Sequence, residues 1–569
     1  MSLDFDYIVI GSGFGGSVMT CRLTEKGYNV CLLERGRQWK MHEFPRRPEE
    51  VRQNMFWDPR QQKYGLMEIR DNPESDVASI TASGLGGGSL IYANVLYRMP
   101  AEFFKAWPGG YTRARLEPFY DQVTTMMEAK PYPFETDSYY RSTPKTSAIK
   151  AAAEHLQKTN DANLKPEFVL PPLAVRFEGK FPGEQSLNSH GALQSKCNKC
   201  GDCDIGCNIH AKNTLDLNYL HRAQKGIKGH KAEIRTHAEV VRIEQHGDHY
   251  KVIYILPEFP VQENSLTAKE VILSAGSIGS TSLLLKMKKQ GVLPKLNAHL
   301  GKKWAGNGDL IAWIFNTKEE PDATKGPVIT GSLEYPQSQY PDGFPHGMYL
   351  QEAGYPMGIA WYLSGKIPQV SSLAGMGHIF IQSMKRHVRK LLKVQDLDPI
   401  NIGHEAVEAV DPASFTRKCF LILGMGRDKS DGEIKLRADN QAIVKWKIDK
   451  SRYHFDRLHT EMKKIADFVK GVYMDSPLLH LNKVISVHPL GGCPMADTPE
   501  HGVVSPLGEV FGYKGLRVID GSILPTSTGT NPSLTIAAIA EYIATTIPNK
   551  TPVTKTLEEL TADLEEFSG

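Results

Sequence analysis

The segment at residues 6–36, which reads DYIVIGSGFGGSVMTCRLTEKGYNVCLLERG, limits the fold of this chain more than any other. An apolar strand runs into glycines at 11, 13 and 16, an amphipathic helix follows, and a second strand ends at the acidic Glu34. Gly11 permits a tight turn, Gly13 lets the backbone approach a pyrophosphate, and Gly16 lets the helix pack closely on the strand. The helix N-terminus then faces the phosphates, and Glu34 lies where a carboxylate accepts ribose hydroxyls. The segment predicts a βαβ dinucleotide-binding unit, which suits FAD and NAD alike.

Two further segments indicate where the chain returns to this nucleotide-binding unit. Residues 83–90, SGLGGGSL, carry too little side chain to form core, so their backbone can be approached by a large planar group. This favours a flavin. A predicted strand pair at 237–245 and 270–274 leads into the small residues 275–280 and then an apolar helix at 281–287. An ordinary strand-to-helix turn is the other interpretation of that segment.

The C-terminal segment at 484–547 holds two polar residues, His488 and Asn531, among turn-forming and apolar neighbours. Asn531 followed by Pro532 predicts a helix that Asn531 caps and that has proline at its first position. The partial positive charge of that N-terminus would stabilise an anionic reduced flavin by about 0.3–2 kcal/mol. The alternatives are a structural histidine at 488 and a simple helix cap at 531.

The chain resembles the glucose-methanol-choline (GMC) oxidoreductase family, in its cholesterol oxidase-like branch. The resemblance spans nearly the whole chain and is carried by the fingerprint above, GLGGGSLIYANV at 84–95, HPLGGC at 488–493 and GLRVIDGSILPTSTGTNPSLTIAAIAE at 515–541. It implies an α/β fold with a discontinuous Rossmann-like FAD-binding domain and a substrate domain of mainly antiparallel sheet and helices. We expect FAD-binding parts at 4–98, 205–300 and 485–549, substrate-domain parts at 99–204 and 301–484, and an acidic tail at 550–569.

The resemblance also implies roles for individual residues. His488 becomes the active-site histidine and Asn531 its hydrogen-bonding partner across the substrate oxygen. Glu352 corresponds to a substrate-facing glutamate, which in steroid-oxidising relatives moves a proton within the ring system; an exposed loop acid is the other interpretation. The expected FAD contacts are Gly11, Gly13, Phe14, Gly15, Gly16, Glu34, Gly86, Gly87, Gly88, Ser89, Val240, Ala275, Gly276, Asp520, Gly521, Asn531 and Pro532.

The implied activity is FAD-dependent oxidation of the hydroxyl group of a bulky apolar alcohol, with a 3β-hydroxysteroid such as cholesterol as the leading substrate. An imidazole with an ordinary pKa of about 6.5 can accept the hydroxyl proton while a hydride passes to flavin N5, and a double bond can then be isomerised. The acceptor of the electrons is oxygen or an electron carrier. No histidine lies beside residues 83–90 for a covalent flavin link, so we expect non-covalent FAD.

Other functions stay open at this point. A dehydrogenase for long-chain or terpenoid alcohols could pass electrons to a carrier through an iron–sulfur cluster. The pairing of His488 with Asn531 would also suit an FAD-containing hydroxynitrile lyase. In a redox-sensing module without catalysis, His488 and Asn531 would have no function.

Four of the eight cysteines lie within eleven residues, as Cys197, Cys200, Cys203 and Cys207. Their C-x2-C-x2-C-x3-C spacing is typical of bacterial ferredoxins, in which the fourth cysteine of such a run serves a second cluster. Here the proline that usually follows is missing, and no second run exists. An iron–sulfur cluster, a zinc ion and reduced thiols are all candidates. A cluster near the flavin would favour a dehydrogenase over an oxidase.

Composition adds little about partners. Lys and Arg number 67 against 64 Asp and Glu, a net charge of +3, which gives no indication of nucleic acid binding. With no leader ahead of the first strand and no apolar run of about 18 residues, we expect a cytoplasmic protein. The basic amphipathic segment at 384–394 suggests peripheral contact with an anionic membrane, or else a helix over the substrate entrance.

Overall fold

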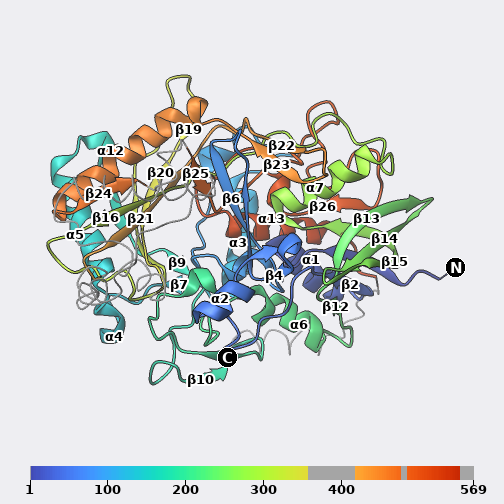
Figure 1. Ribbon diagram of the computed structural model, residues 1–569, viewed down its shortest axis with the longest axis horizontal. Helices are drawn as coiled ribbons and strands as arrows, with labels where there is room; N and C mark the ends of the chain where they lie inside the picture. The colour runs from blue at the N-terminus through green and yellow to red at the C-terminus, as the bar shows by residue number, and fades with distance from the viewer. Residues whose placement is uncertain (1, 357–416, 476–482, 551–569) are drawn as a thin grey trace, which may run out of the picture.

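The computed structural model describes residues 2–356, 417–475 and 483–550. Both the basic segment at 384–394 and nearly all of the acidic tail at 550–569 lie outside these residues. Figure 1 shows two sheets near opposite ends of the long axis of the molecule, with the helix α13 (Ser533–Thr546) between them. This is the mixed α/β architecture that the resemblance implies.

The first sheet has seven strands in the order β12-β2-β1-β15-β14-β13, with β26 paired to β15. Several of its pairings are parallel, as is typical of a nucleotide-binding βαβ fold. They are β1 with β2, β1 with β15, β2 with β12, and β15 with β26. Its strands come from three distant parts of the chain: β1 (Phe5–Ile10), β2 (Val30–Leu33), β12 (Glu233–Arg235), β13 (Glu239–His246), β14 (His249–Leu256), β15 (Phe259–Leu273) and β26 (Leu516–Val518).

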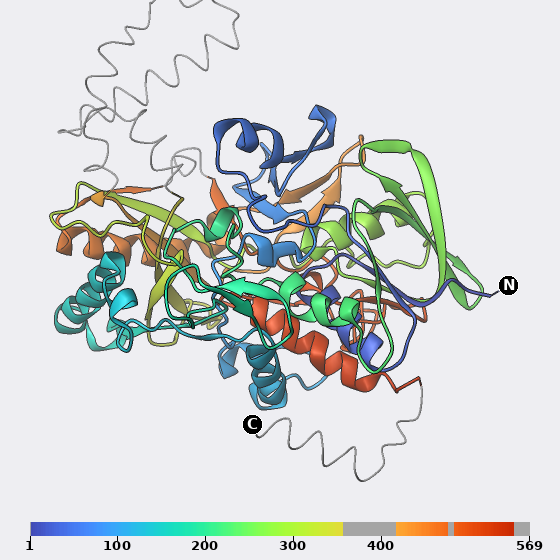
Figure 2. The ribbon, with the colours of Figure 1, turned by 90° about the horizontal axis from the view of Figure 1, so that it is seen from below.

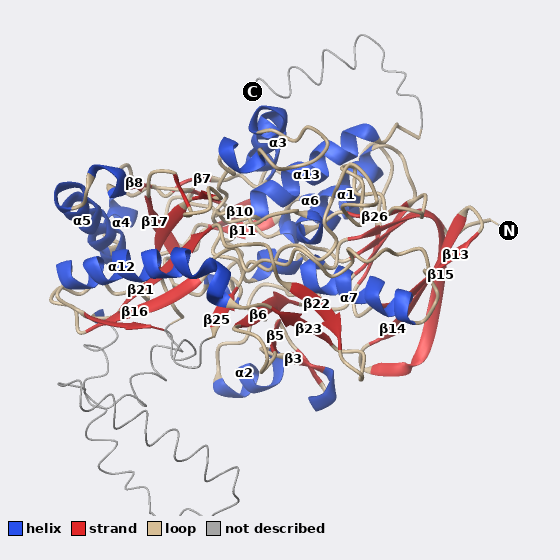
Figure 3. Cartoon of the chain, turned by 90° about the horizontal axis from the view of Figure 1, so that it is seen from above, coloured by secondary structure: helices blue, strands red, loops and turns tan. Residues whose placement is uncertain are grey.

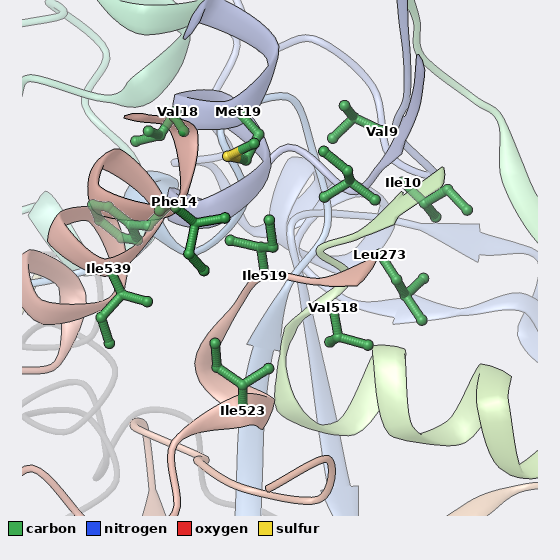
Figure 4. Close-up of a cluster of buried hydrophobic side chains, with 14 of the residues drawn as sticks. Val9, Ile10, Phe14, Val18, Met19, Leu273, Val518, Ile519, Ile523 and Ile539 are labelled. Carbon is green, nitrogen blue, oxygen red and sulfur yellow. The ribbon is translucent and has the colours of Figure 1, made fainter. Parts of the chain in front are cut away.

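The core of this sheet explains why β1 and β2 read as nearly continuous apolar runs. Every residue of β2 is buried, because parallel strands are covered on both faces. Figure 4 shows side chains from β1, α1 (Phe14–Glu25) and the C-terminal segment gathered in one cluster, including Val9, Val18, Ile519 and Ile539. The first and last parts of the chain therefore share a core.

Close backbone contacts fix the N-terminal helix. Gly11 has a φ of +93°, and a Cβ on Gly16 would lie 2.0 Å from the carbonyl oxygen of Gly11. A Cβ on Gly15 would lie 1.8 Å from the carbonyl oxygen of Ile519, directly before the C-terminal segment turns away from the sheet. These positions admit glycine only, so α1 is clamped between β1 and the end of β26.

The middle of the chain differs from the predicted strand pair. An antiparallel hairpin of β13 and β14 precedes β15, which starts at Phe259, well before the expected 270–274. The first half of β15 lacks an apolar pattern because it is mostly exposed. β14 is buried or half-buried along its length, and the predicted strand pair did not include it. The helix α7 (Gly276–Lys289) begins five residues before the predicted 281–287.

The second sheet has six strands in the order β24-β16-β21-β20-β17-β8, and all of its pairings are antiparallel. The helices α5 (Pro144–Thr159) and α12 (Arg452–Phe468) cover one face, as Figure 3 shows. The strands are β8 (Glu167–Val169), β16 (Leu310–Phe315), β17 (Ile329–Glu334), β20 (Met348–Ala353), β21 (Phe420–Gly426) and β24 (Val472–Asp475).

A small third sheet and several helices join the two larger sheets. β25 (Val484–Ser486) pairs in parallel with β6 (Val77–Ala82), which pairs with β5 (Met67–Asp71). In Figure 2, α13 (red) packs against α3 (Arg113–Met126) beneath the first sheet. Further helices are α2 (Pro48–Asn54), α4 (Ser138–Arg141) and α6 (Tyr219–Lys225). The remaining short strands form two-stranded pairs: β3 (Trp57–Asp58) with β4 (Lys63–Tyr64), β7 (Lys130–Pro131) with β9 (Pro172–Leu173), β10 (Gln185–Leu187) with β11 (Leu193–Ser195), β18 (Ser338–Gln339) with β19 (Pro345–His346), and β22 (Glu433–Leu436) with β23 (Ala442–Lys445).

Among the helices of the described ranges, none has the length and apolar character needed to cross a membrane.

The clamp on α1 predicts a stability difference between two glycine variants. Gly15→Ala should lose about 1–3 kcal/mol of unfolding free energy, because its methyl group must push α1 away from Ile519. Gly88→Ala is the matched control, since a Cβ there meets no protein atom within 4 Å; both variants are compared without FAD, because Gly88 is an expected FAD contact. Thermal unfolding of the two purified variants measures the difference. Equal melting temperatures would contradict the clamp.

Candidate active site

His488 lies two residues after β25 and is held by a carboxylate that the sequence did not reveal. Its Nδ1 donates to Oδ1 of Asp309 at 2.8 Å, and Oδ2 accepts the backbone N–H groups of Val487 at 2.8 Å and of His488 at 3.1 Å. The Asp309 side chain is 1% exposed. A proton fixed on Nδ1 leaves the lone pair of the neutral ring on Nε2, where it can accept a proton.

Asn531 is buried beside a residue of the second sheet. Its Oδ1 accepts a hydrogen bond from Nε2 of Gln351, on β20, at 3.1 Å. The prediction that Asn531 caps α13 with Pro532 inside the helix is wrong: the helix begins at Ser533, Pro532 is its N-cap residue, and no side chain caps it. The Asn531 carboxamide oxygen, which would otherwise cap the helix, accepts a hydrogen bond from Gln351 instead.

One turn holds both segments. Asn307 donates through Nδ2 to the carbonyl oxygen of Thr530 at 2.8 Å, and its Oδ1 accepts the N–H of Gly529 at 2.8 Å. Asp309, only two residues later, binds His488. The carbonyl of the intervening Gly308 accepts from Nε2 of the buried His454 at 2.8 Å. The structure therefore brings the His488 and Asn531 segments together through residues 307–309.

Glu352 lies on the opposite face of β20 from Gln351, because side chains alternate along a strand. It is fully buried and forms an ion pair with Lys145 of α5 at 2.5 Å. Its other oxygen accepts the N–H groups of Thr330 and Gly331, each at 2.8 Å. The interpretation as an exposed loop acid is wrong, and the structure does not bring Glu352 together with His488 and Asn531.

Burial has opposite effects on the two partners of this ion pair. It raises the pKa of the Glu352 carboxyl and lowers the pKa of the Lys145 ammonium, while their mutual attraction opposes both shifts. With two backbone amides and an ammonium on the carboxylate, the pair forms a structural link between α5 and the second sheet.

In the nucleotide-binding unit, Glu34 and Ser12 connect the two glycine-rich segments. Oε2 of the buried Glu34 accepts the hydroxyl of Ser12 at 2.6 Å, and Oε1 accepts the N–H of Gly36 at 2.9 Å. The Ser12 hydroxyl in turn accepts the N–H of Gly86 at 3.0 Å. A Cβ on Gly87 would lie 2.7 Å from Cα of Gly13, so the two segments touch. No sequence pattern marks this role of Ser12.

The backbone around these segments fits a bound dinucleotide. No atom lies within 4 Å of the position of a Cβ on Gly88 or Gly276, and only one lies as near as 4.0 Å for Gly13. A ligand can therefore approach the backbone there, next to the N-terminus of α1, whose partial charge favours phosphate. Val240 lies on β13 where a register shift interrupts the pairing with β14.

Asp520 has a structural role in addition to the one expected. Its Oδ2 accepts the N–H of Gly276 at 2.9 Å, and its Oδ1 accepts the N–H of Ser522 at 2.8 Å. The carboxylate thus joins the N-terminus of α7 to the C-terminal segment. Gly521 beside it packs against Leu490, two residues after His488.

All four clustered cysteines line one recess. Cys197, Cys203 and Cys207 are buried, Cys200 is exposed, and none forms a disulfide. Across the described ranges, no three His, Cys, Asp or Glu side chains are arranged to hold a single metal ion. The zinc interpretation has no support in this arrangement.

The buried ion pair yields a stability prediction. Glu352→Gln leaves the Lys145 ammonium buried without its anion and should cost about 3–5 kcal/mol of unfolding free energy. The double variant Glu352→Gln/Lys145→Met removes both charges and should recover most of the loss. Urea unfolding of the three proteins measures this. A double variant no more stable than Glu352→Gln would refute the structural role of the pair.

Comparison with known proteins agrees with this arrangement. Sequence profiles of GMC oxidoreductases match residues 187–300 and 428–540, and a profile of the NAD(P)-binding Rossmann-like domain matches 9–52. The chain is 30% identical to a cholesterol oxidase of Mycobacterium tuberculosis (strain ATCC 25618 / H37Rv), over 97% of this chain and 92% of the relative. It is 29% identical to a cholesterol oxidase of Acinetobacter baumannii, over 98% of this chain and 96% of that one.

A solved structure gives the same fold at lower sequence similarity. Pyridoxine 4-oxidase from Mesorbium loti is 14% identical and superposes with a TM-score of 0.57, over 95% of this chain and 98% of the other. Together with the near full-length relatives, these matches establish that the chain belongs to the GMC oxidoreductase family, in its cholesterol oxidase-like branch, and is an FAD-dependent alcohol oxidoreductase.

Proposed function

We propose that this enzyme oxidises the hydroxyl-bearing carbon of a bulky apolar alcohol, with a 3β-hydroxysteroid such as cholesterol as the leading substrate. The observation that carries the proposal is the turn at 307–309, which binds the His488 side chain and the backbone of Gly529 and Thr530, next to Asn531. The similarity to two cholesterol oxidases over nearly the full chain supports the steroid class.

His488 and Asn531 have different roles at the substrate hydroxyl. Nε2 of His488 accepts the hydroxyl proton, and the Asp309 carboxylate stabilises the imidazolium that results. The Asn531 carboxamide, oriented by Gln351, holds the substrate oxygen without exchanging a proton. Bound FAD supplies the acceptor for the hydride from the carbinol carbon.

The residues that would hold FAD non-covalently come from all three parts of the nucleotide-binding unit. We expect Glu34 at the ribose hydroxyls and the glycine backbone at 11–16 at the pyrophosphate. We propose the same set that the resemblance implies: Gly11, Gly13, Phe14, Gly15, Gly16, Glu34, Gly86, Gly87, Gly88, Ser89, Val240, Ala275, Gly276, Asp520, Gly521, Asn531 and Pro532. The proposed FAD-binding parts are 4–98, 205–300 and 485–549, and the proposed substrate-domain parts are 99–204 and 301–484.

An apolar wall beside the polar pair supports an apolar substrate. Gln351 is paired in register with Leu423 of β21, so the two side chains stand next to each other on one face of the sheet. Leu421 and Met425 share that face with Leu423, and Trp313 of β16 packs onto the same cluster. A hydrocarbon body next to the hydroxyl would lose water contact there.

We assign no double-bond isomerisation to Glu352. Its side chain points to α5, away from the face that carries Gln351, and both of its oxygens have partners.

Asp309 should affect turnover because it binds His488 and stabilises its imidazolium form. Asp309→Asn keeps the shape but removes the charge, and the loss of a hydrogen bond to a charged group, about 1.5–3 kcal/mol, predicts a roughly 10- to 100-fold lower kcat. His488→Ala should lose about 10²- to 10⁴-fold. Steady-state rates are measured with FAD content confirmed by its absorbance. Asp449→Asn, whose side chain is 74% exposed, is the control. Unchanged kcat in Asp309→Asn would contradict the mechanism.

The substrate class can be tested on the flavin directly. Mixed anaerobically with cholesterol, the purified holoenzyme should lose its yellow colour faster than with a long-chain or terpenoid alcohol. Leu423→Ala should raise KM for the sterol by about 10-fold or more at similar kcat, because burial of one leucine side chain contributes about 1.5–3 kcal/mol. Ile422→Ala, on the other face of β21, is the matched control. If no alcohol bleaches the flavin, the proposed function fails.

A further inference from the structure

The four clustered cysteines share one recess, although the ferredoxin spacing alone did not require it. In a two-cluster ferredoxin the last cysteine of this run would serve a second cluster. Here Cys207 lines the same recess as Cys197, Cys200 and Cys203. Gly326 and Pro327, from a distant segment, close the recess on another side. All four sulfurs are thus available to one group.

A buried cation lies next to these sulfurs. The Nζ of Lys212 donates to the carbonyl oxygens of Cys203 at 2.8 Å and Leu90 at 3.1 Å, and it lies 4.7 Å from the ring centre of Tyr92. Lys212 is 1% exposed, and the buried carboxyl of Asp204 attracts its ammonium. Among the described residues, no carboxylate contacts that ammonium directly. A group that carries thiolates in the recess would add negative charge next to this buried cation.

Neighbouring side chains hold the cysteine loop in place and supply donors. The Arg46 guanidinium donates to the carbonyl oxygens of Gly206 at 2.6 Å and Ile205 at 3.1 Å, and to Asp202 at 2.9 Å. Asn94 is fully buried, and its carboxamide lies beside the Cys203 sulfur. An amide donor next to a sulfur stabilises a thiolate that binds a metal cluster.

We propose that Cys197, Cys200, Cys203 and Cys207 bind one [4Fe–4S] cluster. Four cysteine thiolates are the usual ligands of such a cluster. Each thiolate binds a different iron atom, so the sulfurs stand farther apart than the ligands of a single ion, which meet about 2.3 Å from one centre. This explains how four cysteines share a recess although no single-ion site is present in the described residues.

The recess adjoins the part of the nucleotide-binding unit that we expect at the flavin. Lys212 bonds Leu90, the last residue of the glycine-rich turn at 87–90, and the Tyr92 ring lies 5.7 Å from that of Phe14 at the start of α1. A cluster here would take the electrons of alcohol oxidation one at a time. Each substrate yields two electrons and two protons; the electrons leave to a one-electron carrier protein in two steps, and the protons leave to water.

Metal and sulfide analysis of the full-length protein tests the site. Purified without oxygen, the holoenzyme should contain about four iron and four acid-labile sulfide per chain, and broad visible absorbance beyond that of the flavin. Cys203→Ala should lose both iron and sulfide and keep FAD. Because a buried change can disturb folding, the exposed Cys200→Ala provides a second variant, which should lose iron or hold less of it. Cys419→Ala, outside the cluster, should retain the full complement.

The outcomes separate this proposal from the proposed function, on which only the electron-transfer step depends. Flavin-replete protein without sulfide, or with one zinc instead, would overturn the cluster whatever the alcohol activity. Full iron and sulfide with no alcohol able to bleach the flavin would overturn the proposed function and leave the cluster standing. Loss of iron in Cys200→Ala should also slow turnover with a one-electron dye more than turnover with oxygen. Equal slowing would overturn the electron route.

Discussion

The hydrogen bonds of the turn at 307–309 are the constraint on which the site depends. His488 and Asn531 are far apart in sequence, and neither lies in the strands of the two large sheets. From one short turn before β16, Asp309 binds the His488 side chain and Asn307 binds the backbone of Gly529 and Thr530, next to Asn531. Because both contacts come from one backbone segment, the two segments that carry His488 and Asn531 are held relative to each other and to the second sheet. Preorganisation of this kind is what proton and hydride transfer from one carbinol require.

The second sheet contributes to the site through one of its faces only. Along β20, Gln351 points to Asn531, and Glu352 points to α5 and its lysine. The apolar residues that follow Gln351 across the sheet continue the same face. The face covered by α5 and α12 is occupied by core and by a buried ion pair, so substrate chemistry is confined to the other side.

Features of the fold and of the site could be predicted from the sequence where a short stretch of residues marks them by its spacing. The glycines of the first 36 residues carry their meaning in their spacing, and the contacts of Gly11 with Gly16 bear that out. Asp309, Gln351 and Ser12 are isolated polar residues whose partners are set by tertiary contact, so no pattern marks them. Glu352 was assigned by resemblance over a short match, and a strand period of two decides which of two adjacent residues faces the site.

The packing of Gly15 on Ile519 has a consequence for the order in which the chain can fold. The first sheet lacks β15 until the ribosome has passed Leu273, and it lacks β26 until almost the whole protein has been made. During synthesis the earliest strands must wait, exposed or sheltered by chaperones, while the segments between them emerge. A polypeptide cut short before residue 516 would have a nucleotide-binding motif but no complete sheet to hold it.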